Sequence, residues 1–225
     1  MEFEDVVFGR QSVRGFRPDP VPRDVIDAVI ATAKRAPSSM NSQPWHVYVI
    51  TGAPLDEIRE RNMRELVEGL PSQREIFTHG PYEGEHRRRQ VDIAKKLFAA
   101  MGIERDDKAR REDWRRRGFR QFDAPVSLIL TYDKNLEPGA TCKFDLGALS
   151  YGIVLAAWNQ GLGCVVNGQG ISRSHIVREV AGVSADEVIM TAIAMGYPND
   201  EFAANAVRSE REDNQAFVSY VGFAD

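Results

Sequence analysis

The 225-residue sequence predicts an α+β fold, and three observations support this. Apolar residues make up 43% of the chain, which is enough to build a hydrophobic core and excludes a disordered protein. Helical and strand-like segments follow one another without the strict alternation that a doubly wound parallel sheet requires. No repeat, low-complexity tract or Gly/Ser-rich linker interrupts the chain, so we expect a single domain over residues 1–225.

The first half of the chain predicts helices around one strand. Residues 2–10 suit a short helix, and after Pro22 the apolar residues recur at helical spacing until Pro37 ends the run. The β-branched and aromatic run 46–51 suits a strand. Further helices are expected at 55–69, 85–101 and 108–117.

The second half centres on an uncharged helix. We expect Asp145 to cap a helix over 146–160, which carries no charge and many small side chains. A helix that is apolar all round must be buried all round; a second copy of the chain across a dimer axis would cover it, and burial in a monomeric core is the alternative. The other predicted elements are strands at 126–132, 164–166 and 188–195, and a helix capped by Ser172 that ends at Val180.

Charge is distributed unevenly along the chain. The net charge is −4, but segment 82–120 carries thirteen Lys/Arg and eight Asp/Glu, so it is at +5 and the remainder at −9. Its arginine triplets at 87–89 and 115–117 suggest a nucleic-acid-binding module at first sight. Interleaved carboxylates can pair with them at helical spacing, which favours solvated helix faces and no nucleic-acid partner.

Several functional classes are excluded by missing patterns. Cys142 and Cys164 form no CxxC pair, and the four histidines are scattered, so neither a disulfide framework nor a protein-built metal site is expected. The longest nearly uncharged stretch, 146–166, suits a buried helix and turn better than a membrane span. The first residues carry no export signal, which predicts a cytoplasmic protein. GxSxG, P-loop and GxGxxG motifs are all missing.

Polar groups for an anionic, planar ligand occur near the start of the chain. In RQSVRGF, Arg10, Ser12 and Arg14 alternate, and a guanidinium fork bonds two phosphate oxygens at once. A pair of surface arginines is the alternative. The rigid turn at 36–45 adds Ser38, Ser39, Asn41 and Gln43, which either hold a polar ring edge or satisfy only their own backbone.

A third polar segment lies near the end of the chain. Arg208 and Arg211 are placed to meet a phosphate, although Glu210 and Glu212 could neutralise them on the surface instead.

An ordered set of motifs spans almost the whole chain and resembles the flavin-dependent nitroreductase family. The motifs are RQSVRGF, APSSMNSQPWHVYVI, the strand at 124–130 that starts with Ala-Pro, DLGALSYGIVLAAWNQGLGCVVNG, MTAIAMGYP, and AVRSERED followed by VGF. The resemblance implies a central mixed, mostly antiparallel sheet flanked by helices in an intertwined homodimer. The apolar helix would lie at the dimer interface, and a C-terminal extension at about 199–225 would reach over the partner.

The same resemblance implies FMN as the cofactor. Arg14 would lie near the pyrimidine end of the flavin, and Ser38, Ser39 and Asn41 would come from the other subunit. Gln11 stands where many relatives carry a second basic residue, so Arg10 and Arg211 would carry more of the phosphate charge. The implied cofactor-binding residues are Arg10, Gln11, Ser12, Arg14, Pro37, Ser38, Ser39, Asn41, Val166, Asn167, Gly168, Arg208 and Arg211.

The implied activity needs no catalytic acid or nucleophile from the protein, because the flavin carries the chemistry. NADPH or NADH would pass hydride to FMN and leave, and a nitroaromatic would then be reduced in two-electron steps. A helical insertion at about 82–120 would cover the active site, and Phe119, Arg120 and Phe122 would bind the small aromatic nitro substrate, with a core position as the alternative for Phe122. Reductive dehalogenation and enone or quinone reduction are alternative activities on the same scaffold.

Overall fold

Four antiparallel strands form the central sheet of the computed structural model, which describes residues 1–76 and 80–223. Their order is β1 (Trp45–Thr51), β2 (Val126–Asp133), β4 (Glu187–Gly196) and β3 (Gly163–Asn167). A parallel bridge between Ser12 and Cys164 joins the N-terminal segment to the β3 edge. The expected α+β fold with a mostly antiparallel sheet is therefore confirmed.

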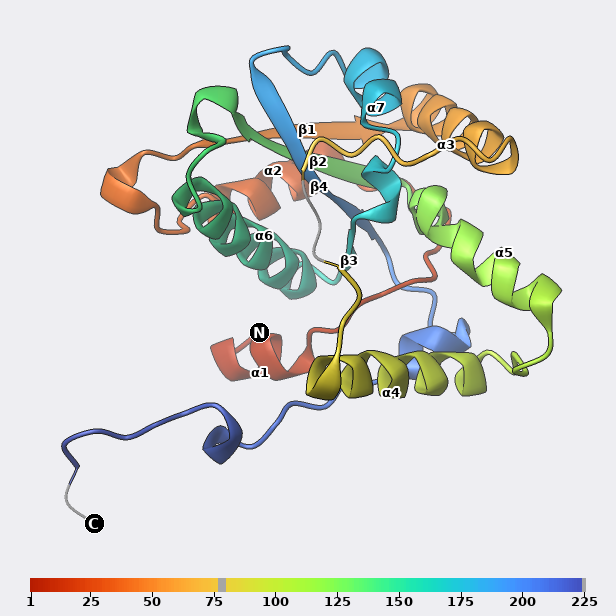
Figure 1. Cartoon of the computed structure of the whole chain (residues 1–225). Helices are drawn as coiled ribbons and strands as arrows, with labels where there is room; N and C mark the ends of the chain where they lie inside the picture. Colours follow the sequence, from red (N-terminus) through yellow and green to blue (C-terminus); the bar gives the residue numbers. More distant parts are fainter. Residues whose placement is uncertain (77–79, 224–225) are drawn as a thin grey trace.

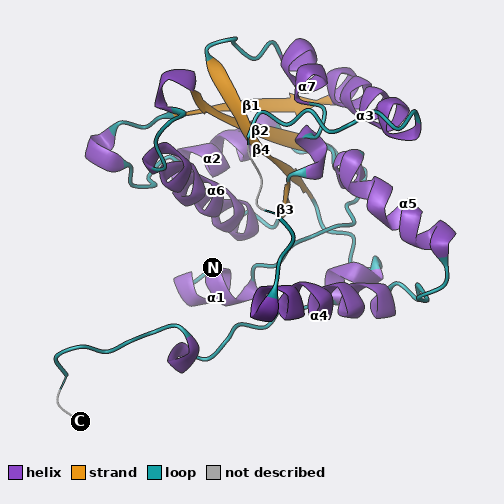
Figure 2. Ribbon diagram, in the orientation of Figure 1, coloured by secondary structure: helices purple, strands orange, loops and turns teal. Residues whose placement is uncertain are grey.

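Seven helices surround this sheet in the described ranges (Figure 2). They are α1 (Phe3–Gly9), α2 (Arg23–Ala33), α3 (Gly52–Val67), α4 (Gly84–Ala100), α5 (Lys108–Phe119), α6 (Thr141–Asn159) and α7 (Ser174–Ala181). Each helix and strand expected from the sequence is present, with ends shifted by a few residues.

Two predicted helix caps are wrong. Asp145 lies inside α6, where it is buried and accepts a hydrogen bond from the Ser39 backbone N–H at 3.1 Å. Ser172 lies before the N-cap of α7, which is Arg173, and its Oγ accepts from Arg74 Nη2 at 3.4 Å. In both cases a partner far along the chain uses the polar group that a local capping rule assigned to the helix end.

The sheet separates two hydrophobic layers (Figure 1). Alternate residues of β2 point to opposite faces, so Leu128 and Leu130 pack with α2 and α6 while Ile129 packs with α3 and α7. Burial on both faces explains why β2 and β4 are apolar almost throughout.

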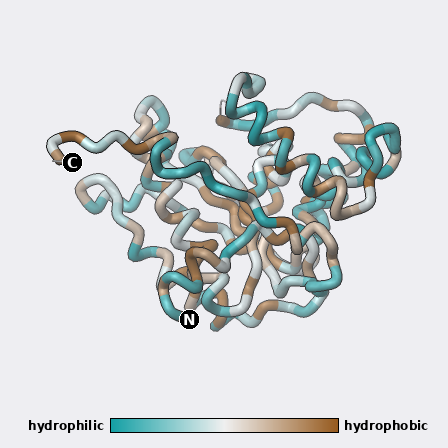
Figure 3. Tube along the Cα trace, turned by 90° about the horizontal axis from the view of Figure 1, so that it is seen from below, coloured by the Kyte–Doolittle hydropathy of each residue, from teal (hydrophilic) through white to brown (hydrophobic). Residues whose placement is uncertain are grey.

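Helices α4 and α5 lie beyond the β3 edge of the sheet (Figure 1). Helix α5 contacts α3 and the turn at 169–171, and α4 contacts the turn at 203–206. The chain after Val207 first runs along α4, where Glu210 and Glu212 form ion pairs with it, and then projects from the body in a segment in which hydrophobic positions reappear (Figure 3). It stays a prediction that 82–120 is an insertion and that 199–225 is an extension. Residues 224–225 lie outside the described chain.

The described residues show neither a membrane-spanning helix nor a cluster of metal ligands. No helix among the described residues has the length and apolar composition to cross a membrane. In the same ranges, no three His, Cys, Asp or Glu side chains gather as metal ligands would. His79 lies outside the described residues. The cytoplasmic location expected above is not tested and stays a prediction.

Candidate functional site

A cavity of about 830 Å³ lies where the β3 edge of the sheet faces α4 and α5. Its walls come from the segment after α1, the connection between α3 and α4, helices α4 and α5, the turn before β2 and the end of β3. The lining residues are Arg14, Arg74, Leu97, Phe98, Lys108, Arg111, Glu112, Trp114, Arg115, Phe122, Val165, Val166, Asn167, Gly168 and Gln169.

The floor of the cavity is apolar and formed by the end of β3. Val166 is 53% exposed, although the other four residues of this strand are buried. The neighbouring Asn167 side chain points away from any ligand, because it donates to the Gly118 carbonyl at 2.7 Å and to Gln121 Oε1 at 3.1 Å. The floor therefore offers an apolar side chain and backbone groups, which suits the face of a flat ring.

The segment after α1 runs close against β3. The Val13 N–H donates to the Cys164 carbonyl at 3.0 Å, and a Cβ on Gly163 would lie 2.4 Å from Val13 Cγ2. Only glycine permits this approach. The close approach brings Arg14 to the edge of the floor.

Arg14 is fixed through its backbone and carries no counter-ion. Its N–H donates to Asn205 Oδ1 at 2.8 Å, and its carbonyl accepts from Arg117 Nη2 at 2.9 Å. The guanidinium donates to the Ser12 carbonyl at 3.3 Å, and among the described residues no carboxylate pairs with it. Burial lowers the pKa of the Arg14 side chain. A cation in this state favours a negatively charged ligand.

Arg10 and Gln11 also carry unsatisfied polar atoms. Arg10 Nε and Gln11 Oε1 are buried without a hydrogen-bond partner. Arg208 Nη1 donates to the Gly9 carbonyl at 2.9 Å, which places it beside Arg10. Arg211 instead bonds within its own segment, to the Ser209 carbonyl at 3.2 Å and to Ser209 Oγ at 2.9 Å.

The predicted residues of the 37–41 turn do not line this cavity in the described chain. The turn lies at the end of α2, far from α5 in Figure 1. Ser39 bonds to Asp145 of α6, as noted above, and Ser38 Oγ accepts from the Gln43 N–H at 3.0 Å. Met40 is fully exposed, and both Met40 and Asn41 have left-handed backbone angles, with φ of 50° and 57°. Within one chain, Ser38, Ser39 and Asn41 stay apart from Arg14.

Phe122 reaches the cavity from a strained turn. Gln121, Phe122 and Asp123 all have positive φ, between 54° and 57°. The buried Gln121 side chain holds this turn by donating to the Gly170 carbonyl at 3.1 Å. Such a turn persists only where the surroundings fix it, and here it directs Phe122 inward.

The other two predicted substrate residues point elsewhere. Phe119 is buried beneath Arg115 and Arg173, at 5.5 and 5.8 Å from its ring centre. Arg120 pairs with Asp123 at 3.0 Å. Neither residue belongs to the cavity wall of the described chain, and their substrate role stays a prediction.

The cavity residues on α4 and α5, across from the β3 floor, were not predicted from the sequence. Arg111 lies 4.5 Å above the Phe98 ring, and Trp114 stacks on Phe202 with ring centres 6.5 Å apart. An isolated tryptophan in the highly charged KARREDWRRRGF was the available signal, because a solvated helix face rarely carries one. Arg74 had no such signal, since 70–76 shows no periodicity.

The cavity lining is strongly cationic, with five basic residues and one carboxylate. Glu112 accepts from Arg115 at 2.7 Å and from Arg116 at 2.9 Å, and these bonds hold the pKa of Glu112 at about 2. Arg115 is thus neutralised. The remaining four cations, which are Arg14, Arg74, Lys108 and Arg111, have no carboxylate partner among the described residues.

Comparison with protein-family models assigns this chain to a family. The model for the nitroreductase family matches residues 7–197. The chain belongs to the nitroreductase family. The resemblance seen in the sequence motifs is thereby confirmed.

Individual members of the nitroreductase family match over nearly the full length. Chloronitrobenzene nitroreductase of Comamonas testosteroni is 30% identical, over 97% of this chain and 96% of the relative. The 4-nitrobenzoate reductase of Nocardioides sp. (strain LMS-CY) is 32% identical, over 94% and 87% respectively. Among solved structures, the FMN-dependent nitroreductase NfnB from Mycobacterium smegmatis in complex with NADPH has a TM-score of 0.89 at 29% identity, over 97% of each chain.

Proposed function

We propose that this member of the nitroreductase family is an FMN-dependent oxidoreductase that takes hydride from NADPH or NADH and reduces nitroaromatic compounds in two-electron steps. The observation that carries the proposal is the apolar β3 floor bordered by arginines without counter-ions. The relatives support it, because their names give nitroaromatic substrates, FMN and NADPH.

The residues present fit FMN. The exposed Val166 offers a surface for the flavin ring, and the backbone of 166–168 is expected to meet its central nitrogen. The unpartnered Arg10 Nε and Gln11 Oε1 would gain hydrogen bonds from the ribityl phosphate and its chain. Arg208 supports the phosphate better than Arg211 does, since its bond to Gly9 holds it beside Arg10.

When bound, FMN supplies hydride-transfer chemistry that no side chain of the cavity can perform. The chain's own residues would bind and orient the cofactor and the substrate. Arg14, whose backbone is fixed by Asn205 and Arg117, would hold the pyrimidine end of the flavin and would stabilise negative charge there. Phe98, Trp114 and Phe122 present aromatic surfaces to a stacked substrate or nicotinamide and exclude water from the floor.

The proposal includes a homodimer formed through α6. This helix exposes one stripe at helical spacing, and Phe144 and Tyr151 on it are 80% and 48% exposed. The remaining stripe positions are Gly147, Ala148 and Leu155. A second chain packed here would cover the stripe and bring its own 38–41 turn towards the flavin, which explains why Ser38, Ser39 and Asn41 stay apart from Arg14 within one chain.

The projecting C-terminal segment fits the same dimer. Phe217, Tyr220, Val221 and Phe223 are each more than two-thirds exposed. Four large apolar side chains in an unsupported segment need a surface to cover them, and we expect the partner subunit to provide it.

An anaerobic absorbance experiment tests the proposed function. The purified protein is loaded with FMN, then given NADPH, then nitrobenzene. We expect the flavin bands to bleach with NADPH and to return with the nitroarene. A protein that cannot be loaded with FMN would contradict the proposal. Bands that return only with a halogenated phenol or with an enone would favour the dehalogenase or enone reductase reading instead.

A further inference from the structure

Arg74 is a cation held in the cavity without a partner for its charge. Its Nε is buried and makes no hydrogen bond to any described residue, and its Nη2 lies 3.4 Å from Ser172 Oγ. No carboxylate pairs with it among residues 1–76 and 80–223. Burial lowers the pKa of this guanidinium. Leaving such a group partly desolvated costs free energy that a structural role would not require.

The guanidinium lies next to the floor of the cavity. A Cβ built on Gly168 would be 3.6 Å from Arg74 Nη2 and 3.8 Å from its Cζ. Gly168 belongs to the segment expected to contact the flavin's central nitrogen. Arg74 is therefore within reach of a molecule stacked on that part of the flavin.

The segment is anchored on both sides of Arg74 by hydrogen bonds of its two neighbours. Before it, the Gln73 N–H donates to the Ser172 carbonyl at 2.8 Å. After it, both Glu75 carboxylate oxygens accept from Arg178 Nη2 at 2.8 Å, and Glu75 Oε2 also accepts from the Ile189 N–H at 2.8 Å. These bonds join the segment to α7 and β4, so they fix the backbone from which the Arg74 side chain extends.

The surroundings of Arg74 suit an aromatic ring that carries a negative group. Phe98, Trp114 and Phe122 line the same cavity. The one lining carboxylate, Glu112, is already occupied by Arg115 and Arg116. Lys108 and Arg111 reinforce the positive potential, so cations outnumber carboxylates in the lining.

We propose that Arg74 is a specificity-determining residue that binds the carboxylate of an aromatic nitro acid, and that the Glu75–Arg178 ion pair positions it. The inference rests on the proposed function and narrows its substrate class. Membership of the family does not decide between neutral and carboxylated nitroarenes, whereas the charges of this cavity favour the carboxylated ones. A guanidinium fork meets both oxygens of a carboxylate, and a neutral ring leaves it unpaired.

The cofactor and the nicotinamide are weaker matches for Arg74. Arg10, Arg14 and Arg208 are already placed for FMN, because Arg10 and Arg14 flank the bridge from Ser12 to Cys164 of β3 and Arg208 is bonded to Gly9. The nicotinamide ring carries no anionic substituent, and the phosphates of NADPH are separated from that ring by a ribose. An anion beside Gly168 is therefore best supplied by the substrate.

Steady-state kinetics with two substrates test this. FMN-loaded wild type, Arg74→Gln and the control Arg105→Gln are each assayed with 4-nitrobenzoate and with nitrobenzene. Arg105 is exposed and does not line the cavity, so its variant removes the same charge from the same region. We expect Arg74→Gln to raise KM for 4-nitrobenzoate about 10- to 100-fold with little change in kcat, as loss of a charged hydrogen bond predicts. Nitrobenzene kinetics and the Arg105→Gln enzyme should match wild type, and Arg74→Lys should recover part of the loss.

A binding measurement separates this inference from the proposed function. Benzoate, which cannot be reduced, is titrated calorimetrically into each oxidised FMN-loaded protein. Its Kd should rise about tenfold or more in Arg74→Gln alone. Equal losses on both nitroarenes, a weakened FMN affinity in Arg74→Gln, or unchanged benzoate binding would overturn the role of Arg74. Wild type that binds FMN and benzoate but reduces neither nitroarene would overturn the proposed function and leave the anion site standing.

Discussion

Arg14 and Arg74 show how the fold keeps a partly buried guanidinium in place without a neutralising carboxylate from the described chain. Each places a guanidinium in the same cavity, and neither has a carboxylate partner in the part of the chain that the structure describes. The stabilisation comes from elsewhere: Asn205 and Arg117 hold the backbone of Arg14, and the residues on both sides of Arg74 are tied to α7 and β4. Backbone anchors thus offset the cost of leaving two cations available for anionic ligands.

Replacement of Arg14 should weaken FMN binding. Arg14→Gln keeps a hydrogen-bonding side chain but removes the charge, so we expect the Kd for FMN to rise about tenfold or more, as for a charged hydrogen bond. Flavin fluorescence titration measures it. The control is Arg17→Gln, because Arg17 is exposed and already paired with Asp19 at 3.3 Å. An Arg14→Gln protein that binds FMN as tightly as wild type would remove this residue from the cofactor site.

The two arginines also differ in how far the sequence could predict them. Arg14 belongs to the short alternating motif RQSVRGF, so its neighbours in sequence are its neighbours in space. Arg74 lies in an aperiodic connection whose path depends on Arg178, 103 residues beyond Glu75. No local pattern encodes such a partner, and the direction of the Arg74 side chain follows only from the folded chain.

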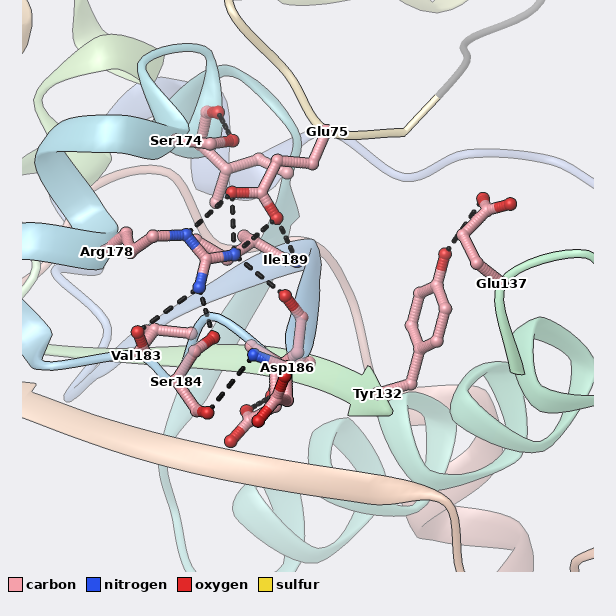
Figure 4. A network of polar contacts seen from close by, with 12 residues as sticks. Glu75, Tyr132, Glu137, Ser174, Arg178, Val183, Ser184, Asp186 and Ile189 are labelled. Atoms are coloured by element: carbon pink, nitrogen blue, oxygen red, sulfur yellow. Dashed lines mark hydrogen bonds and ion pairs between the residues drawn. The ribbon is translucent and has the colours of Figure 1, made fainter. Parts of the chain in front are cut away.

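At the scale of elements, the connection between α3 and α4 acts as part of the site. Glu75 joins this connection to the Arg178 guanidinium of α7 and to the backbone N–H of Ile189 in β4. The same Arg178 donates to the Val183 and Ser184 carbonyls and, at 2.8 Å, to the Glu187 carbonyl. One ion pair therefore fixes a cavity-lining segment, a helix and a strand relative to one another (Figure 4).

Glu75→Gln should loosen this arrangement without removing any cavity-lining atom. Glutamine has one acceptor oxygen where glutamate has two, so one hydrogen bond and the ion pair are lost. The free energy of unfolding should therefore fall by about 1–2 kcal/mol in urea titrations. The KM for 4-nitrobenzoate should rise while that for nitrobenzene stays constant, because only the placement of Arg74 changes. Glu57→Gln is the control, since it breaks an exposed helix pair with Arg61 and should cost under about 0.5 kcal/mol. Unchanged KM values in a destabilised Glu75→Gln protein would show that the ion pair is structural only.

Element ends were predicted less well than the elements, and α6 shows why. The uncharged run that begins at Leu146 suggested Asp145 as its cap, but the helix starts at Thr141 and carries Asp145 into the interior. There the carboxylate accepts from the Ser39 N–H of the 38–41 turn. A capping rule considers only local hydrogen bonds, whereas this carboxylate is satisfied by a tertiary one.

At the scale of the whole molecule, the predicted cofactor-binding residues lie in two separate places on one chain. The Arg14 side of the cavity lies near α4 and α5, while the 38–41 turn lies at the end of α2. The exposed stripe of α6 and the apolar C-terminal segment are further surfaces that one chain does not cover. A symmetric dimer accounts for all of these features with one packing arrangement.

Gly147→Glu tests this dimer directly. A Cβ at Gly147 meets no atom within 4 Å, and glycine is a weak helix former, so the single chain should fold as well with glutamate there. In the dimer the new carboxylate would be buried against the partner without a counter-ion, which costs several kcal/mol. Sedimentation should therefore show a monomer with wild-type helix content, and FMN binding should be lost with the partner's 38–41 turn. Val67→Glu, on the exposed end of α3, is the control and should remain a dimer with bound FMN. A Gly147→Glu dimer would exclude α6 as the interface, and a monomer with wild-type FMN affinity would show that one chain holds the cofactor by itself.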